Sequence, residues 1–163
     1  MGFDRANTIF RSIDKSCAIP LLRANKASIG ENCDIETPLY FHNCSDYSNL
    51  IIGNNCHIGK NCFFDLKSKV RIGNNVVISM QATFITHLDM SKSALSRIYP
   101  NQSADIIIED DCYIGANSTL LYNVKLGKCS LVAACSLVRT SFDEYSVITG
   151  IPAVLKKLSV TGN

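Results

Sequence analysis

The sequence of 163 residues has no apolar run long enough to span a membrane. Its first segment, MGFDRANTIFRSIDKSC, carries charges at Asp4, Arg5, Arg11, Asp14 and Lys15, so it lacks the apolar centre of a signal peptide. Runs of Lys or Arg are also missing, and the formal net charge is only +2, which excludes a basic stripe suited to nucleic acid. We therefore expect a cytoplasmic protein with no nucleic-acid partner and no membrane span.

A period of six residues runs through most of the chain. The repeat begins with an aliphatic or aromatic residue, often followed by Gly, and a small or β-branched residue stands four places after the first. The leading residues are Ile52, Ile58, Phe64, Ile72, Ile78, Phe84, Ile108, Ile114, Leu120, Leu126, Val132 and Val138. A period of six fits neither a helix nor a simple alternating strand, but it fits a short strand, a corner and another short strand.

Three such sides close a triangular coil, and parallel stacking of coils would bury the leading residues along one axis. The pairs Gly-Asn and Asn-Asn in IGNN, at 52–55 and 72–75, suit corners that need positive φ. With 47% hydrophobic residues, the chain is long enough for one domain of this kind and too short for two of ordinary size.

The cysteines fall where the repeat requires a small side chain. Cys33, Cys56, Cys62 and Cys112 stand at the fourth place after a leading residue, so we expect them to be reduced and buried. Tetrahedral zinc sites usually pair ligands two to four residues apart, whereas Cys56 and Cys62 are six apart. We therefore predict no metal site and no disulfide scaffold.

The repeats resemble those of the hexapeptide-repeat acyltransferases. The resemblance is strongest from Ile108 to Leu158, which is similar to the C-terminal half of the maltose and galactoside O-acetyltransferases and their polysaccharide-modifying relatives. The segment FITHLD, Phe84 to Asp89, resembles the segment of that family that carries its catalytic His. The resemblance implies an all-β fold, a left-handed parallel β-helix, with a long loop inserted after that His.

The remaining segments divide the chain. Phe3, Ala6, Phe10, Ile13 and Cys17 are spaced like one face of a helix that Pro20 would end. We expect residues 1–28 to form a helical cap on the open end of the coils. Residues 29–150 would form the β-helix, with an inserted loop at about 88–106, and residues 151–163 a C-terminal extension.

The resemblance implies that His87 is the general base. A hydroxyl is a poor nucleophile at neutral pH, and His is suited to accept its proton while the oxygen attacks a thioester directly. By the same resemblance, Asp65 stands where the sugar acetyltransferases place an acid that binds acceptor hydroxyls, although a solvated corner acid fits equally well. Asp89, two residues beyond His87, could orient the imidazole or contact the acceptor.

The coenzyme residues follow from the coil length together with the resemblance. Residues 18 apart should stack directly, so Ala116 and Ala134 would form an edge without bulk, where the pantetheine arm of acetyl-CoA could lie. Arg139 and Thr140 stand near the position of the family's phosphate-binding Thr-Lys pair, with the charge moved by one residue; an exposed corner Arg is the alternative.

These features predict an acetyl-CoA-dependent O-acetyltransferase acting on a sugar or a surface-glycan precursor. The family resemblance implies a homotrimer with active sites between subunits. The alternatives are transfer to serine, to the nitrogen of an amino sugar or to a xenobiotic hydroxyl, and, from a different class, a non-catalytic β-helix scaffold.

Overall fold

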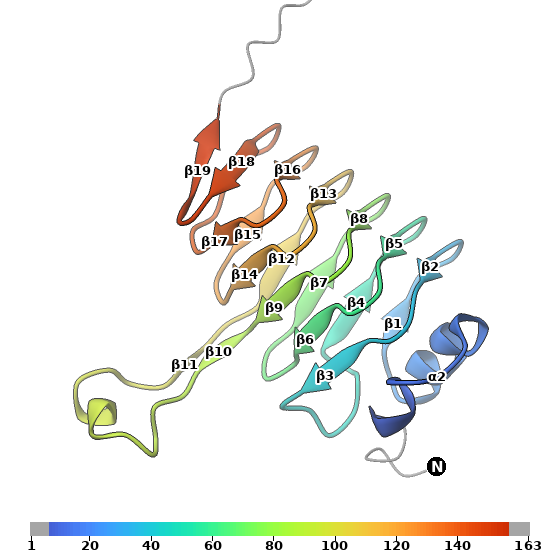
Figure 1. Ribbon diagram of the computed structural model, residues 1–163, viewed down its shortest axis with the longest axis horizontal. Coiled ribbons are helices and arrows are strands. Elements are labelled where there is room, and N and C mark those ends of the chain that lie inside the picture. The colour runs from blue at the N-terminus through green and yellow to red at the C-terminus, as the bar shows by residue number, and fades with distance from the viewer. Residues whose placement is uncertain (1–6, 157–163) are drawn as a thin grey trace, which may run out of the picture.

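The computed structural model describes residues 7–156, which form a parallel β-helix with a projecting arm (Figure 1). Each coil contributes one short strand to each of three sheets, and each strand pairs in parallel with its equivalent in the next coil. The three-sided coil predicted from the six-residue period is therefore confirmed. Residues 1–6 and 157–163, which carry the outer parts of the expected cap and C-terminal extension, lie outside the described residues.

We call the sheets A, B and C in the order in which the chain visits them. Sheet A contains β1 (Ser28–Ile29), β4 (Leu50–Ile52), β7 (Val70–Ile72), β12 (Ile106–Ile108) and β15 (Lys125–Leu126). Sheet B contains β2 (Asp34–Ile35), β5 (His57–Ile58), β8 (Val77–Ile78), β13 (Tyr113–Ile114), β16 (Leu131–Val132), β18 (Val147–Gly150) and β19 (Ala153–Lys156). Sheet C contains β3 (Tyr40–His42), β6 (Phe63–Asp65), β9 (Thr83–Ile85), β14 (Thr119–Leu121) and β17 (Leu137–Val138).

The leading residues of the repeats form the core. The side chains predicted to lie inside are all buried: Ile52, Ile58, Ile114, Leu120 and Val132. Because successive side chains of a strand point to opposite faces, the three-residue strand β4 turns both Leu50 and Ile52 inward, whereas a two-residue strand such as β2 turns one side chain inward. The burial of each of these side chains stabilises the folded protein by roughly 1.5–3 kcal/mol. Every coil adds such residues to the core.

Asn and Gly serve the corners for different reasons. Asn55 and Asn75 have φ of 55° and 56°, as predicted for residues that tolerate the left-handed conformation. The same prediction for the glycines is wrong, because Gly53 and Gly73 do not have positive φ. A Cβ on Gly53 would instead lie 2.6 Å from the carbonyl oxygen of Gly73. Glycine is needed there because the backbones of adjacent coils approach closely.

The cysteine prediction is confirmed for three of the four positions. Cys56, Cys62 and Cys112 are unpaired and buried, and the Sγ of Cys56 donates to the carbonyl of Gly73 in the next coil at 3.1 Å. Burial raises the pKa of the Cys62 thiol to about 11. Cys33 is unpaired but only partly buried, since it belongs to the first coil and has no further coil below it.

The N-terminal segment is helical but is divided differently from the prediction. Residues 10–12 form a turn, the 3₁₀ helix η1 spans Lys15–Cys17, and α2 spans Ala18–Ala24. Pro20 therefore lies in the first turn of a helix rather than after one, where its missing N–H costs nothing. Of the residues placed on one helical face, Phe3 and Ala6 lie outside the described residues. Phe10 packs edge-on against Phe41 of the first coil, with ring centroids 5.2 Å apart.

Two hairpins depart from the parallel coils. The arm is an antiparallel pair of β10 (His87–Leu88) and β11 (Gln102–Ser103), joined by a loop that contains the 3₁₀ helix η2 (Ala94–Arg97). It projects from the side of the coils (Figure 1). At the other end, β18 and β19 pair antiparallel through the turn at Ile151-Pro152. No helix within residues 7–156 is long and apolar enough to cross a bilayer.

We predict that Gly115→Ala destabilises the fold by about 1–3 kcal/mol, the usual cost of overpacking. A Cβ there would lie 2.4 Å from the backbone nitrogen of Ala134, so the coils would have to separate. Urea unfolding followed by circular dichroism measures the change. Lys60→Ala, at an exposed corner, is the control and should change stability by less than about 0.5 kcal/mol. Equal stability of the two variants would contradict the close-approach argument.

Candidate functional site

Three insertions leave the coils at one corner, between sheets C and A. Leading residues are six apart at the other corners of these coils. At this corner the spacing is eleven from Phe41 to Ile52, eight from Phe64 to Ile72 and 24 from Phe84 to Ile108. Because the three coils are adjacent, with β3, β6 and β9 paired in order, the inserted residues converge on one another.

A buried carboxylate lies at the centre of this corner. Asp65, the last residue of β6, has 1% of its surface exposed. Its Oδ2 accepts hydrogen bonds from the backbone N–H of Thr86 at 2.8 Å and from the Thr86 hydroxyl at 2.9 Å. His87 Nδ1 lies 2.6 Å from the same oxygen. Asp65 is therefore held by the residues that begin the arm.

The environment of Asp65 fixes the tautomer of His87. Burial by itself raises the pKa of this carboxyl, but the hydrogen bonds from His87, Asn43 and Thr86 together lower it. Asp65 is then ionised near neutral pH and can only accept hydrogen bonds. His87 Nδ1 must be the donor in their contact, which leaves the lone pair on Nε2 of the neutral ring.

Asn43 completes the cluster from the first coil. It follows β3 directly, and its Nδ2 donates to Asp65 Oδ1 at 2.9 Å. The same amide nitrogen lies 3.2 Å from His87 Nε2. The candidate site thus combines one residue from each of the three insertions, Asn43, Asp65 and His87, with Thr86 beside them.

The structure places Asp65 and Asp89 differently from the roles that the sequence predicted for them. Asp65 is buried against His87, so it is not placed to accept hydrogen bonds from the hydroxyls of an acceptor at the surface. Asp89 was the candidate to orient the imidazole, but it lies exposed on the arm, where it accepts hydrogen bonds from the backbone N–H and the hydroxyl of Ser91. Those hydrogen bonds lower the pKa of Asp89. The carboxylate that orients the ring is Asp65.

Ala116 and Ala134 stack as the 18-residue coil requires. Ile114 pairs with Val132, and the backbone N–H of Cys135 donates to the carbonyl of Ala116 at 2.8 Å. Met80, one coil earlier, continues the column, since its carbonyl accepts from the N–H of Asn117. We call Ala116 and Ala134 the small-residue column; it lies at the corner between sheets B and C and ends at the larger side chain of Met80.

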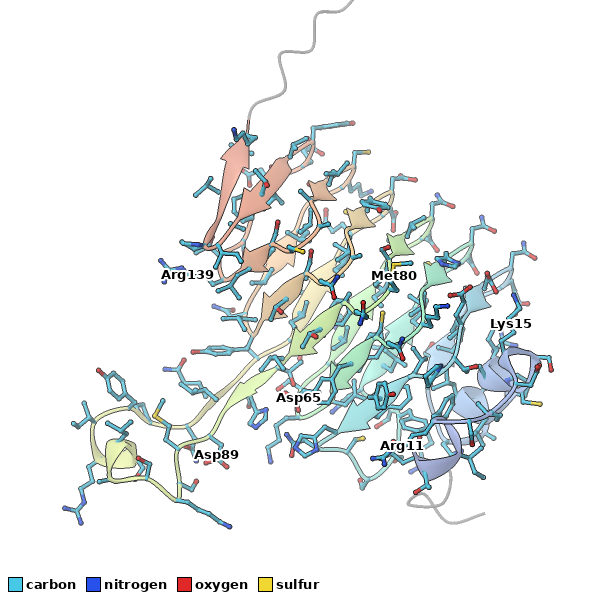
Figure 2. All side chains as sticks on the ribbon, viewed as in Figure 1. Arg11, Lys15, Asp65, Met80, Asp89 and Arg139 are labelled. Atoms are coloured by element: carbon cyan, nitrogen blue, oxygen red, sulfur yellow. The ribbon has the colours of Figure 1, made fainter. Side chains whose placement is uncertain are left out.

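Arg139 and Thr140 lie at a different corner from the alanines. They follow β17 at the corner between sheets C and A, where with Leu121, Tyr122, Asn123 and Ser141 they line an open groove of about 530 Å³. The small-residue column is separated from His87 and Arg139 by the width of sheet C, as the positions of Met80, Asp65 and Arg139 in Figure 2 illustrate. One chain alone does not bring the alanines to His87.

The neighbourhood of the site offers no reactive thiol and no cluster of metal ligands. Burial, with the nearby charges of Asp46 and Asp65, raises the pKa of the Cys44 thiol to about 11. No group of three or more His, Cys, Asp or Glu side chains within residues 7–156 is arranged to hold a metal ion.

The sequence and fold of this chain resemble those of known proteins, which indicate the kind of reaction that this site could perform. A family model described as the hexapeptide repeat of succinyl-transferase matches residues 49–80 and 105–137, on either side of the arm. These two segments match the hexapeptide repeat, and the fold of the chain is the left-handed β-helix.

The individual proteins that this chain resembles include acetyltransferases. The galactoside O-acetyltransferase of Lactococcus lactis is 27% identical over 143 residues, which cover 84% of this chain and 65% of that protein. A 2,3,4,5-tetrahydropyridine-2,6-dicarboxylate N-acetyltransferase of Staphylococcus aureus is 41% identical over 63 residues, or 38% of this chain and 26% of that one. The chain therefore spans less than two thirds of the length of either relative.

A solved structure matches nearly the whole fold. The hexapeptide-repeat acetyltransferase of Vibrio cholerae in complex with acetyl coenzyme A superimposes with a TM-score of 0.82 at 25% identity, covering 94% of this chain and 83% of that one.

Sequence reasoning missed Asn43 and Thr86. The signal for Asn43 was present, because the eleven-residue spacing from Phe41 to Ile52 marks an insertion at the corner that also carries Asp65 and His87. Thr86 offered no such signal. Its hydroxyl accepts from the backbone N–H of Ser68 at 3.0 Å, a contact between two insertions that the repeat pattern does not describe.

We predict that Asp65→Asn lowers the free energy of unfolding by about 1–3 kcal/mol at pH 7, because a charged acceptor of several hydrogen bonds is lost. The pKa of Asp65 is lower in the folded protein than in the unfolded chain. Its stabilising effect is therefore present above the unfolded pKa and disappears as the pH falls through the folded one. The difference between parent and variant should narrow below about pH 4.

Urea titrations of both proteins at several pH values measure this difference. Asp34→Asn, which alters an exposed carboxylate beside His57, is the control and should change stability little. A difference for Asp65→Asn that is the same at pH 3 and pH 7 would contradict the assignment of an ionised, hydrogen-bonded Asp65.

Proposed function

We propose that this protein is an acetyl-CoA-dependent O-acetyltransferase that acts on a sugar or a surface-glycan precursor. The observation that carries the proposal is the pair of Asp65 and His87, with Nδ1 2.6 Å from a buried carboxylate. Such a pair supplies a neutral imidazole whose free nitrogen can accept a proton, which is the task of a general base. The acetyltransferases among the relatives support the reaction class.

In the proposed reaction, His87 Nε2 accepts the proton of an acceptor hydroxyl while its oxygen attacks the thioester carbonyl. The bond between carbon and sulfur breaks, and the proton passes to the coenzyme sulfur, so that an acetyl ester and free CoA leave. Asp65 stabilises the imidazolium that exists between these two proton transfers. The raised pKa of Cys44 keeps the cysteine beside the site protonated, which favours direct attack over an acyl-cysteine intermediate.

Acetyl-CoA would bind between copies of the chain. The small-residue column lacks the side-chain bulk that would block the pantetheine arm, and Arg139 with Thr140 would contact the coenzyme phosphates. Because His87 and the column lie at opposite edges of sheet C, a second copy must present its column to this His87. Closed rings built from one repeated contact are cyclic, and we propose a homotrimer, as the resemblance to the hexapeptide-repeat acyltransferases implies.

The proposed acceptor rests on the names of the relatives. The Lactococcus relative is named for galactosides, and an O-acetylated sugar agrees with that name. An amine acceptor is the second candidate, since the Staphylococcus relative is an N-acetyltransferase and an ammonium group also needs a base. A scaffold without catalysis would not require a buried carboxylate paired with a histidine. We also propose a cytoplasmic location, in keeping with eight unpaired cysteines.

We predict that His87→Ala lowers the turnover of acetyl transfer by about 10²- to 10⁴-fold, because the proposed general base is removed. The affinity for acetyl-CoA should stay within about twofold, since the change affects mainly the chemical step. Parent and variant are incubated with acetyl-CoA and a panel of sugars and amines, and products are read by mass spectrometry. His57→Ala, on the outer face of sheet B, is the matched control and should keep parental turnover.

A second prediction concerns the coenzyme and the subunit boundary. Ala134→Trp should fold normally but bind acetyl-CoA at least about tenfold more weakly by calorimetry, because the indole occupies the proposed pantetheine path. Ser28→Trp, at an exposed position of sheet A, is the size-matched control.

Mixing then tests whether the site is shared. His87→Ala and Ala134→Trp chains are refolded together. At some subunit interfaces, the intact His87 of an Ala134→Trp chain will then face the intact small-residue column of a His87→Ala chain, and part of the activity should return. Activity that stays at the sum of the separate variants would contradict a site between copies.

A further inference from the structure

Asn43 occupies a backbone conformation that selects its residue type. Its φ is 53°, in the left-handed region, where Asn is tolerated far better than most side chains. It stands directly after β3, whose last residue, His42, pairs with Asp65 of the next coil. The first insertion therefore turns the chain so that the Asn43 side chain reaches over the corner toward Asp65 and His87.

The distances from Asn43 to His87 define an unusual contact. Nδ2 lies 3.2 Å from Nε2 and 3.4 Å from Nδ1 of the same ring. A donor in the ring plane could be this close to only one of the two nitrogens. The amide therefore lies over the face of the imidazole, and the in-plane lone pair of Nε2 is left free.

The same amide also fixes the second oxygen of the carboxylate. Oδ2 of Asp65 is occupied by His87 and Thr86, and Oδ1 accepts from Asn43 at 2.9 Å. With both oxygens held, the carboxylate cannot rotate to offer His87 a different geometry. A single side chain thus restrains both members of the pair.

We propose that Asn43 is a positioning residue for the acetyl transfer, an inference that rests on the proposed function. Its amide locks the carboxylate of Asp65 and covers one face of the His87 ring, so that Nε2 points in a fixed direction toward the acceptor. Asn43 acts through Asp65 and His87 and does not take part in the proton transfer itself. Partners that orient metal-ligating histidines typically change activity by about 10- to 100-fold, and we expect an effect of the same order for Asn43.

Two substitutions separate the amide from the backbone. Asn43→Gly removes the side chain and keeps the left-handed backbone without strain. Asn43→Asp keeps the shape but replaces the donor with a carboxylate beside Asp65, so it should be at least as harmful. Asn32→Gly is the matched control, because Asn32 has nearly the same φ of 55° in an exposed corner between sheets A and B.

The first measurement is steady-state kinetics. Asn43→Gly should lose about 10- to 100-fold in kcat, with KM for acetyl-CoA and acceptor within about twofold, whereas Asn32→Gly should match the parent. The second is ¹⁵N NMR of the imidazole nitrogens in ligand-free protein. The parent should show one tautomer of His87, protonated at Nδ1, and Asn43→Gly should show a mixture or exchange-broadened signals.

The two readouts distinguish the inference from the function on which it rests. If the parent acetylates no acceptor but its single tautomer is lost in Asn43→Gly, the proposed function fails while the restraint of the ring by Asn43 stands. If Asn43→Gly keeps the turnover of the parent, or loses turnover with unchanged imidazole signals, the positioning role is overturned.

Discussion

The parallel hydrogen bonds between coils are the constraint on which the rest of this structure depends. They place each residue directly above its equivalent in the previous coil, as in the register of Ile52 with Ile72 and of Ile114 with Val132. Every position of the repeat becomes a column, and each column must satisfy one requirement along its whole length. Inward columns require apolar bulk, whereas the columns beside them require small side chains. This is why Cys, Val, Ala and Ser can replace one another there.

The same constraint decides where a site can be built. Additional residues within a strand would shift the register and turn inward side chains outward, so insertions are confined to corners. All three insertions between Phe41 and Ile108 leave at the corner between sheets C and A. Their coils are neighbours, so polar residues distant in sequence gather there without disturbing the apolar axis. The regular part of the fold thereby provides a rigid base for an irregular cluster.

The buried charge of Asp65 then determines which side chains can surround it. A carboxylate with 1% of its surface exposed is costly unless it is fully hydrogen-bonded. Asp65 meets this condition with donors from Asn43, Thr86 and His87, and the histidine is the one donor that can also exchange protons. The need to satisfy a buried charge therefore orients an imidazole, and the thiol of Cys44 nearby stays protonated for related electrostatic reasons.

The sequence by itself determined the period, the three-sided coil, the core column and the buried positions of Cys56, Cys62 and Cys112, because these follow from spacing along the chain. It also indicated His87 and the stacking of Ala116 on Ala134. Only the tertiary structure decided that Asp65 rather than Asp89 contacts His87, that Asn43 lies over the imidazole, and that Arg139 and the alanines stand at different corners. These contacts join insertions of unequal length, and their geometry depends on how the inserted loops fold back on one another. A six-residue repeat specifies its columns, but it carries no information about the path of the residues that interrupt it.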